Sequence, residues 1–218
     1  MVHFIEHFSK VTLRISTLDK TGALLSRCSG FLYKPSATAL PVVITAGHDL
    51  PQEGSFIETA IINNDKMLMI NAGKFNVFYN HEDIDYAYST LPTELYKNDI
   101  KAFENIAVTI YQHEFVKAVR GEAYGFAVVN NYEFVTNHAG GYFVPSYYCY
   151  EVGLELVKQD EHLNYFKPTE FKGDDYYRGA SGSPIADPEG QITSILIGGT
   201  PDFLLRAFRL DNIELILP

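Results

Sequence analysis

Three short segments carry residue types that together can perform nucleophilic chemistry. An apolar run at 42–44 leads through small residues to His48, which places a possible general base at the end of a rigid strand. Asp85 begins a second run of apolar and small residues, where a carboxylate could be buried against that imidazole and fix its tautomer. Ser181 lies in Gly-Ala-Ser-Gly-Ser-Pro, whose glycines would let the amides of Gly179 and Ser181 point at one spot and form an oxyanion hole.

Each segment also has a purely structural interpretation. His48 could make an ordinary hydrogen bond at a strand end, and the Ser181 segment could be a small-residue turn closed by Pro184. Asp83 and Asp85 could belong to a turn or to a calcium loop. The calcium loop would need further oxygen ligands at regular spacing, which the neighbouring histidine and tyrosine do not provide.

The order of the three residues along the chain distinguishes between the known folds that carry a serine, histidine and aspartate triad. No histidine follows Ser181 in the sequence, which excludes the α/β-hydrolase order, where the histidine comes after the nucleophile. The subtilisin order requires an aspartate before the histidine, and only Asp19 precedes His48, in an apparent surface turn. The remaining order, histidine then aspartate then serine, is that of the two-barrel proteases.

The composition is that of a globular protein. Of the 218 residues, 46% are hydrophobic and 20% are charged, which is enough apolar material for a substantial core. The net charge of −10 argues against nucleic acid or an anionic membrane as a partner, because either would need a basic surface. No run approaches the ~18 consecutive apolar residues of a membrane span.

The N-terminal residues lack the basic start and the long apolar run of a signal peptide. The chain has two cysteines, Cys28 and Cys149, fewer than a secreted domain of this kind would usually carry. These features predict a reducing, cytoplasmic location, with secretion after processing as the alternative. The two thiols could still pair if the fold brings them together.

The chain is predicted to be mostly β. Short apolar or alternating segments recur between Gly, Pro and Ser residues, and the fifteen Tyr and fifteen Phe favour strands, which indicates a sandwich or barrel. Residues 93–103 and 209–217 have weak helical patterns, and 91–104 is the candidate crossover between two lobes. The expected strands are residues 11–15, 28–33, 41–46, 56–62, 67–70, 75–79, 107–111, 116–121, 124–129, 151–156 and 192–197.

Several motifs resemble those of the chymotrypsin/trypsin-like serine protease superfamily. The Thr-Ala-Gly-His that ends at His48 is similar to the family's Thr-Ala-x-His, and the Asp-Tyr-Ala that starts at Asp85 to its Asp-hydrophobic-Ala. The Gly-x-Ser-Gly-Ser-Pro around Ser181 resembles that of the glutamyl endopeptidases. Residues 29–32 and 190–199 are similar to the strand before the histidine and to the strand that lines the substrate cleft. The resemblance is closest to the disulfide-poor bacterial glutamyl-endopeptidase-like and HtrA-like branches.

The resemblance implies an all-β, chymotrypsin-like fold in one peptidase unit, 1–218. Two antiparallel six-stranded β-barrels, at 10–95 and 105–205, would pack side by side with the catalytic cleft between them. Ser181 would be the nucleophile, His48 the general base and Asp85 its orienting acid, with the amides of Gly179 and Ser181 holding the oxyanion. No metal or cofactor is required. The backbone of residues Leu196, Ile197 and Gly198 would pair with the substrate.

The chain also departs from the family pattern. Secreted relatives have a disulfide from the position of Cys28 to the residue after the histidine, which here is Asp49, so that bridge is absent. In the trypsin-like subset the position of Asp175, six residues before Ser181, lies at the base of the P1 pocket and selects Arg or Lys. Tyr176 next to it could fill part of the pocket, and the run Gly173-Asp174-Asp175 could equally be a solvated acidic turn. Leu196 replaces the histidine by which glutamyl endopeptidases recognise glutamate, so a basic P1 residue and a small or medium apolar one both stay open.

The sequence therefore predicts a serine endopeptidase whose partner is a peptide or protein substrate. Two other functions are consistent with the same residues. One is a catalytically silent fold that binds peptides or proteins, and the other is a viral or self-processing protease that acts on its own polyprotein. A regulatory protein partner that activates the enzyme is also compatible with the sequence.

Overall fold

The computed structural model describes most of the chain in eight segments. The candidate crossover at 91–104, the weak helix at 93–103 and the expected strand at 107–111 lie outside these segments. The described residues are 12–36, 39–50, 56–63, 66–71, 75–80, 83–90, 115–137 and 140–213.

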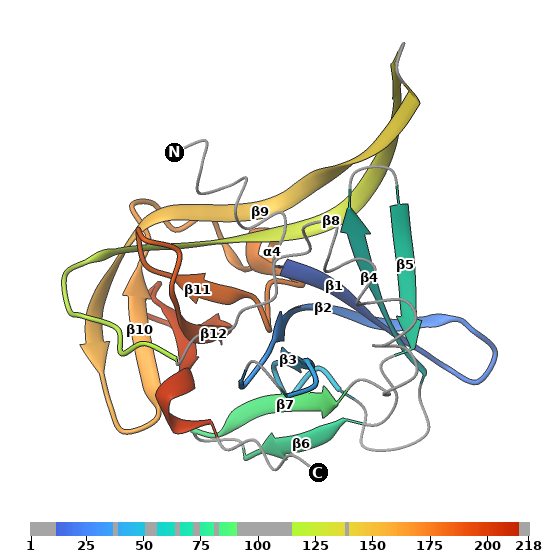
Figure 1. Ribbon diagram of the computed structural model, residues 1–218. Coiled ribbons are helices and arrows are strands. Elements are labelled where there is room, and N and C mark those ends of the chain that lie inside the picture. Colours follow the sequence, from blue (N-terminus) through green and yellow to red (C-terminus); the bar gives the residue numbers. More distant parts are fainter. Residues whose placement is uncertain are drawn as a thin grey trace.

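The N-terminal half is one antiparallel sheet of seven strands (Figure 1). Its spatial order is β5-β4-β1-β2-β3-β7-β6. The central strand β3 is buried along its whole length, because β2 and β7 flank it on either side and its residues are Val-Val-Ile-Thr. The strands are β1 (Thr12–Leu18), β2 (Leu24–Tyr33), β3 (Val42–Thr45), β4 (Phe56–Asn63), β5 (Lys66–Asn71), β6 (Asn76–Tyr79) and β7 (Asp85–Thr90).

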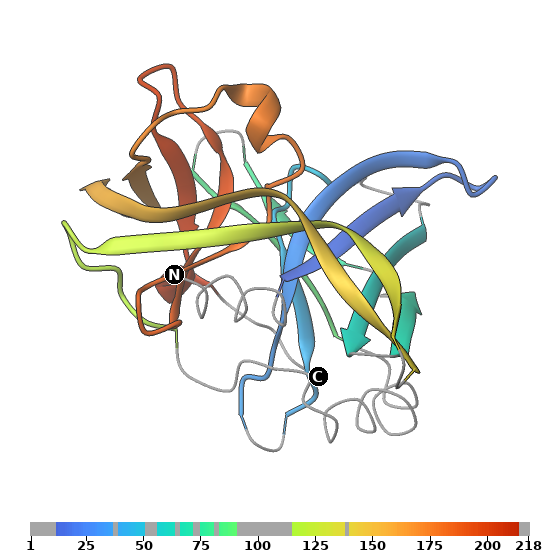
Figure 2. The ribbon, with the colours of Figure 1, turned by 90° about the horizontal axis from the view of Figure 1, so that it is seen from above.

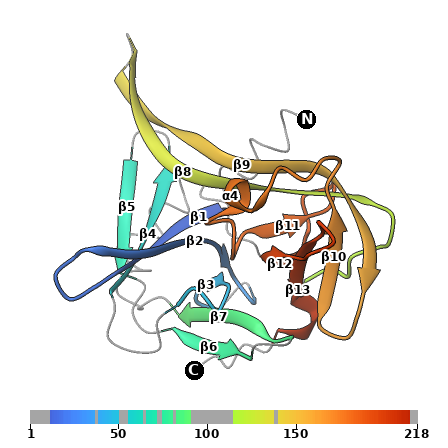
Figure 3. The same cartoon turned by 180° about the vertical axis from the view of Figure 1, so that it is seen from behind.

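The C-terminal half is a closed barrel of six strands in the order β10-β13-β12-β11-β8-β9. A short helix, α4 (Asp174–Tyr177), packs beside β9 and precedes the Ser181 segment (Figure 3). A single 3-10 turn, η2 (Leu210–Asn212), follows the last strand. The barrel strands are β8 (Ala123–Asn137), β9 (Gly140–Gln159), β10 (Leu163–Lys167), β11 (Pro184–Ala186), β12 (Ile192–Gly199) and β13 (Leu205–Arg209).

The longest strands, β8 and β9, form a hairpin that links the two halves. They contain 15 and 20 residues and pair from Ala123 with Glu155 out to Asn137 with Gly140. Seen from above, the hairpin leaves the barrel and crosses to the N-terminal sheet (Figure 2), where β8 contacts β1 and β9 contacts β4 and β5. The hairpin is therefore shared between the barrel and the sheet.

The all-β, chymotrypsin-like architecture predicted from sequence is confirmed, with differences in detail. The N-terminal half is an open seven-stranded sheet in place of the expected six-stranded barrel, because its edge strands β5 and β6 do not pair with each other in the described residues. The expected strand at 116–121 is wrong, since this segment has no ladder partner and ends in a turn. The helical pattern at 209–217 is wrong over its described part, where β13 ends and η2 forms one turn.

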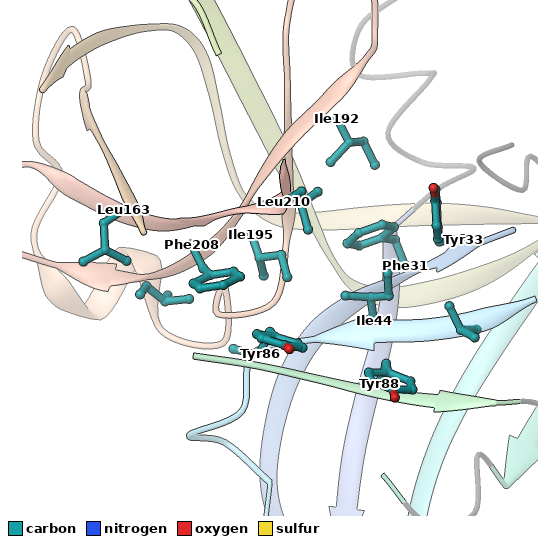
Figure 4. Close-up of a cluster of buried hydrophobic side chains, with 13 residues drawn as sticks. Phe31, Tyr33, Ile44, Tyr86, Tyr88, Leu163, Ile192, Ile195, Phe208 and Leu210 are labelled. Carbon is teal, nitrogen blue, oxygen red and sulfur yellow. The ribbon is translucent and has the colours of Figure 1, made fainter. Parts of the chain in front are cut away.

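One hydrophobic core lies between the two halves. Phe31, Ile44 and Tyr86 come from β2, β3 and β7, and they meet Ile195 and Phe208 from β12 and β13 (Figure 4). The Tyr86 and Phe208 rings stack with centroids 5.0 Å apart. Each fully buried side chain of this size stabilises the fold by about 1.5–3 kcal/mol, so this cluster fixes the sheet against the barrel.

Candidate active site

The end of strand β3 positions His48. Buried Thr45 is the last residue of the strand, and a tight turn follows in which the Leu50 amide donates to the Gly47 carbonyl. A Cβ at Gly47 would lie 3.0 Å from the Tyr86 carbonyl oxygen, tighter than an ordinary contact, so glycine lets the chain pass β7 without displacing it. The small residues before His48 therefore allow the turn to pack against β7.

Asp85 starts β7 and is almost fully buried, with 4% of its surface exposed. Its Oδ1 accepts hydrogen bonds from the amides of Gly47 at 2.7 Å and His48 at 3.0 Å, and its Oδ2 lies 2.6 Å from His48 Nδ1. Because an ionised carboxylate only accepts hydrogen bonds, Nδ1 carries the proton and Nε2 is left with its lone pair. One carboxylate thus fixes the turn, the ring orientation and the tautomer.

His48 Nε2 lies 3.2 Å from Ser181 Oγ, so the side chains of His48, Asp85 and Ser181 form one chain of contacts. Burial lowers the pKa of His48, but the hydrogen bond to Asp85 and the negative charges of Asp49 and Asp85 outweigh that effect. The pKa therefore lies above its usual value of 6.5. The arrangement suits a general base that takes a proton from the serine hydroxyl.

The Ser181 segment lies between β2 and β12. Ser29 of β2 donates its amide to the Ser181 carbonyl at 2.7 Å and its hydroxyl to the Gly179 carbonyl at 3.0 Å. On the other side, the Gly182 amide donates to the Leu196 carbonyl at 2.7 Å. Gly182 has φ +87°, and a Cβ there would collide with the Ser29 carbonyl oxygen, so this position requires glycine.

The same hydrogen bonds leave two amides available. The carbonyls of Gly179 and Ser181 face Ser29, whereas no acceptor within the described part of the chain takes the amide protons of Gly179 and Ser181. Gly179 has φ +81°, a conformation that glycine adopts without strain. Two unused donors beside a serine hydroxyl match the requirement of an oxyanion hole.

A pocket of about 590 Å³ opens beside Ser181 and Gly179. Gly198 and Gly199 at the end of β12 form one wall, and Asp174 lies near them, with Oδ1 3.7 Å from where a Cβ on Gly199 would be. Such a pocket beside the candidate nucleophile can receive a substrate side chain.

The structure places the expected specificity residues differently from the sequence analysis. The Asp175 side chain is 93% exposed, forms an ion pair with Arg178 at 3.0 Å and does not line the pocket. Its neighbour Asp174 lines the pocket instead, at the end near Gly199. Tyr176 packs on the ring of Tyr177 and bonds to the backbone of Tyr150 outside the pocket. The one-residue difference arises because α4 directs successive side chains to different sides.

The three residues expected to pair with the substrate, Leu196, Ile197 and Gly198, lie in different surroundings. Leu196 is buried in the barrel core. Ile197 lines a smaller pocket of about 170 Å³ together with His48, Tyr79 and Arg206. Gly198 lines the larger pocket. Only the last two residues therefore face the space around the candidate site.

Two features of the site were missed by the sequence analysis. Asp49 Oδ2 lies 3.3 Å from His48 Nε2, and its side chain is 25% exposed. Tyr177, a wall of the large pocket, donates to Glu151 Oε1 at 2.9 Å, and Lys172 pairs with the same carboxylate at 2.8 Å. An acid directly after a candidate base was a signal for Asp49, whereas nothing in the sequence connects Glu151 to Tyr177.

The described segments contain no group of three or more His, Cys, Asp or Glu residues that could hold a metal ion. Nor does any helix within them have the length and apolar character to cross a membrane.

The fold matches solved protease structures at low sequence identity. A Glu endopeptidase is 14% identical, with a TM-score of 0.54 over 91% of this chain and 84% of that chain. The Rv3671c protease of M. tuberculosis is 13% identical, with a TM-score of 0.52 over 96% and 88%. Tobacco etch virus protease is 10% identical, with a TM-score of 0.56 over 94% and 74%. No protein-family model and no curated protein matches the sequence. The chain thus has the fold of the chymotrypsin-like proteases.

Proposed function

We propose that the protein is a serine endopeptidase that hydrolyses peptide bonds through an acyl-enzyme. The observation that carries this proposal is the continuous chain from Asp85 Oδ2 to His48 Nδ1, at 2.6 Å, and from His48 Nε2 to Ser181 Oγ, at 3.2 Å. The protease fold of the structural neighbours supports the same class of reaction.

In the first half of the reaction, His48 Nε2 takes the proton of Ser181 Oγ as that oxygen attacks the peptide carbonyl carbon. The carbonyl oxygen becomes an oxyanion and receives hydrogen bonds from the amides of Gly179 and Ser181. When the tetrahedral intermediate collapses, the C–N bond breaks and His48 gives its proton to the leaving nitrogen. The acyl group stays on Oγ as an ester.

In the second half of the reaction, a water molecule is the nucleophile and the same steps follow. His48 takes a proton from the water as its oxygen attacks the ester carbon, and the proton then returns to Ser181 Oγ when the acid is released. Asp85 stabilises the imidazolium in both halves, because its carboxylate is buried and already hydrogen-bonded to Nδ1.

A cysteine nucleophile is the usual alternative to serine beside a histidine. The chain has only Cys28 and Cys149, both buried as free thiols, and burial raises the pKa of each to about 12. Neither forms the reactive thiolate near neutral pH. Ser181 is the residue whose hydroxyl reaches His48, which supports the serine mechanism.

The test is labelling of the purified protein with a fluorophosphonate probe, with peptide hydrolysis measured in parallel. The wild type should react, and Ser181→Ala should lose both labelling and hydrolysis. Ser183→Ala is the matched control, because the Ser183 hydroxyl is buried with no hydrogen-bond partner in the described structure and should be dispensable. A folded wild type that neither labels nor cleaves peptides would overturn the proposal and favour a peptide-binding module.

A further inference from the structure

Asp49 places a carboxylate against the reacting atoms of the candidate site. Its Oδ2 lies 3.3 Å from His48 Nε2, the nitrogen that exchanges the proton. Burial raises the pKa of the Asp49 carboxyl, while the nearby His48 and the Ser181 hydroxyl oppose that rise. Asp49 is not part of the proton path from Asp85 to Ser181, so its position needs another explanation.

The proton path itself shows which part of a substrate comes closest to Asp49. His48 Nε2 must protonate the leaving nitrogen. The backbone nitrogen of P1′, the residue after the scissile bond, therefore has to come within hydrogen-bonding distance of Nε2. Asp49 Oδ2 lies 3.3 Å from this same histidine nitrogen. Its backbone carbonyl accepts a hydrogen bond from Ser26 of β2 at 3.2 Å, whereas the opposite side of the Ser181 segment is bound to Leu196 of β12. Asp49 is thus held on the β2 side of the site, where it lines the large pocket beside Ser181.

The charge of Asp49 lacks a fixed counterion. No Lys or Arg in the described segments forms an ion pair with it, and its partner His48 must be neutral to act as a base. Asp49 and Arg27 of β2 both line the large pocket, but Arg27 is exposed to solvent. A partly desolvated carboxylate without a countercharge is unfavourable, and a cation from a ligand would relieve that cost.

We propose that Asp49 is the specificity-determining residue on the leaving-group side and selects substrates with Lys or Arg at P1′. The proposal rests on the serine endopeptidase function proposed above. In the free protein the Asp49 carboxylate contacts His48 Nε2. It must move away from Nε2 when the backbone nitrogen of P1′ approaches. A cationic P1′ side chain gives it a new partner at that moment, whereas an apolar or acidic one does not.

The experiment uses peptides that share one sequence before the scissile bond and carry Lys, Arg, Ala or Glu at P1′, with products identified by mass spectrometry. We expect kcat/KM of the wild type to be roughly tenfold to a hundredfold higher for Lys and Arg than for Ala, the range for a hydrogen bond to a charged group, and lowest for Glu. Asp49→Asn should remove the preference, and Asp49→Lys should reverse it toward Glu.

Asp174→Asn is the matched control, because Asp174 is an acid of the same large pocket at the end near Gly199. It should keep the P1′ preference. Equal wild-type rates for all four peptides, or a basic preference that survives in Asp49→Asn, would overturn the inference and leave the protease function standing. Absence of both hydrolysis and fluorophosphonate labelling would overturn the protease function, and the inference with it.

Discussion

Asp85 holds His48 at two places, the backbone amide through Oδ1 and the ring nitrogen Nδ1 through Oδ2. In a buried carboxylate with 4% exposure, these two contacts tie the position of the turn to the orientation of the ring. A change at Asp85 can therefore be designed to keep one contact and to alter the other.

Asp85→Asn is such a change. Its amide oxygen can still accept from the backbone of residues 47 and 48, while its NH₂ group faces Nδ1 and forces the proton onto Nε2, the wrong tautomer. We expect kcat to fall by roughly 10⁴ with little loss of stability, measured by peptide hydrolysis and urea unfolding. Asp83→Asn is the control, since Asp83 is 40% exposed and pairs with His162 at 3.5 Å. A larger loss in Asp83→Asn would contradict the assignment of the acid.

Gly182→Ala should destabilise the protein by about 2–4 kcal/mol, because φ is positive there and the new Cβ would collide with the Ser29 carbonyl. The free energy of unfolding in urea measures this effect. Gly121→Ala is the matched control, since Gly121 has φ +82° but nothing within 4 Å of its Cβ position. Equal losses in the two variants would show that strain alone, and not contact with β2, explains the glycine.

Asp49→Asn should move the acid limb of the pH profile of kcat/KM to lower pH. The negative charge of Asp49 helps to raise the pKa of His48, and the base works only when it is neutral. Removing that charge lowers the pKa of His48, so the neutral form persists to more acidic pH. Profiles measured with a substrate that has Ala at P1′ isolate this effect from substrate charge. An unchanged or upward-shifted limb would be inconsistent with the described contact.

Asp174→Asn should weaken cleavage after Arg or Lys by roughly tenfold, because Asp174 is an acid in the large pocket beside Gly198 and Gly199. Asp175→Asn should have little effect, since its side chain is 93% exposed and pairs with Arg178. A library that varies the residue before the scissile bond provides the measurement. Preferred cleavage after Leu or Ala, indifferent to both substitutions, would favour an apolar P1 residue instead.

Local sequence patterns were sufficient to predict those parts of the candidate site that lie in short segments. The strand end before His48, the start of β7 at Asp85 and the small-residue turn at Ser181 each have a recognisable pattern, and the structure brings these three side chains together. The alternation and aromatic content of the chain likewise predicted an all-β fold. Such features are set by neighbours along the chain.

What could not be predicted depends on contacts between distant segments. The side of α4 from which Asp174 reaches the large pocket depends on how the helix packs against the barrel. The seven-stranded sheet depends on which strand edge accepts the β4–β5 hairpin. The expected strand at 116–121 has suitable residues, but Tyr124 bonds to both the amide and the carbonyl of Val119, so these groups do not enter a ladder.

The core around Tyr86 and Phe208 has a consequence for how the proposed activity would be lost on heating. The candidate base His48 and the candidate nucleophile Ser181 come from opposite sides of this cluster, so neither half holds the complete candidate site by itself. We expect heat inactivation to coincide with a single cooperative melting transition, with no partly active stage in between. A split version, expressed as two fragments, would expose the apolar faces that now cover one another and would recover function only by reassembling across them.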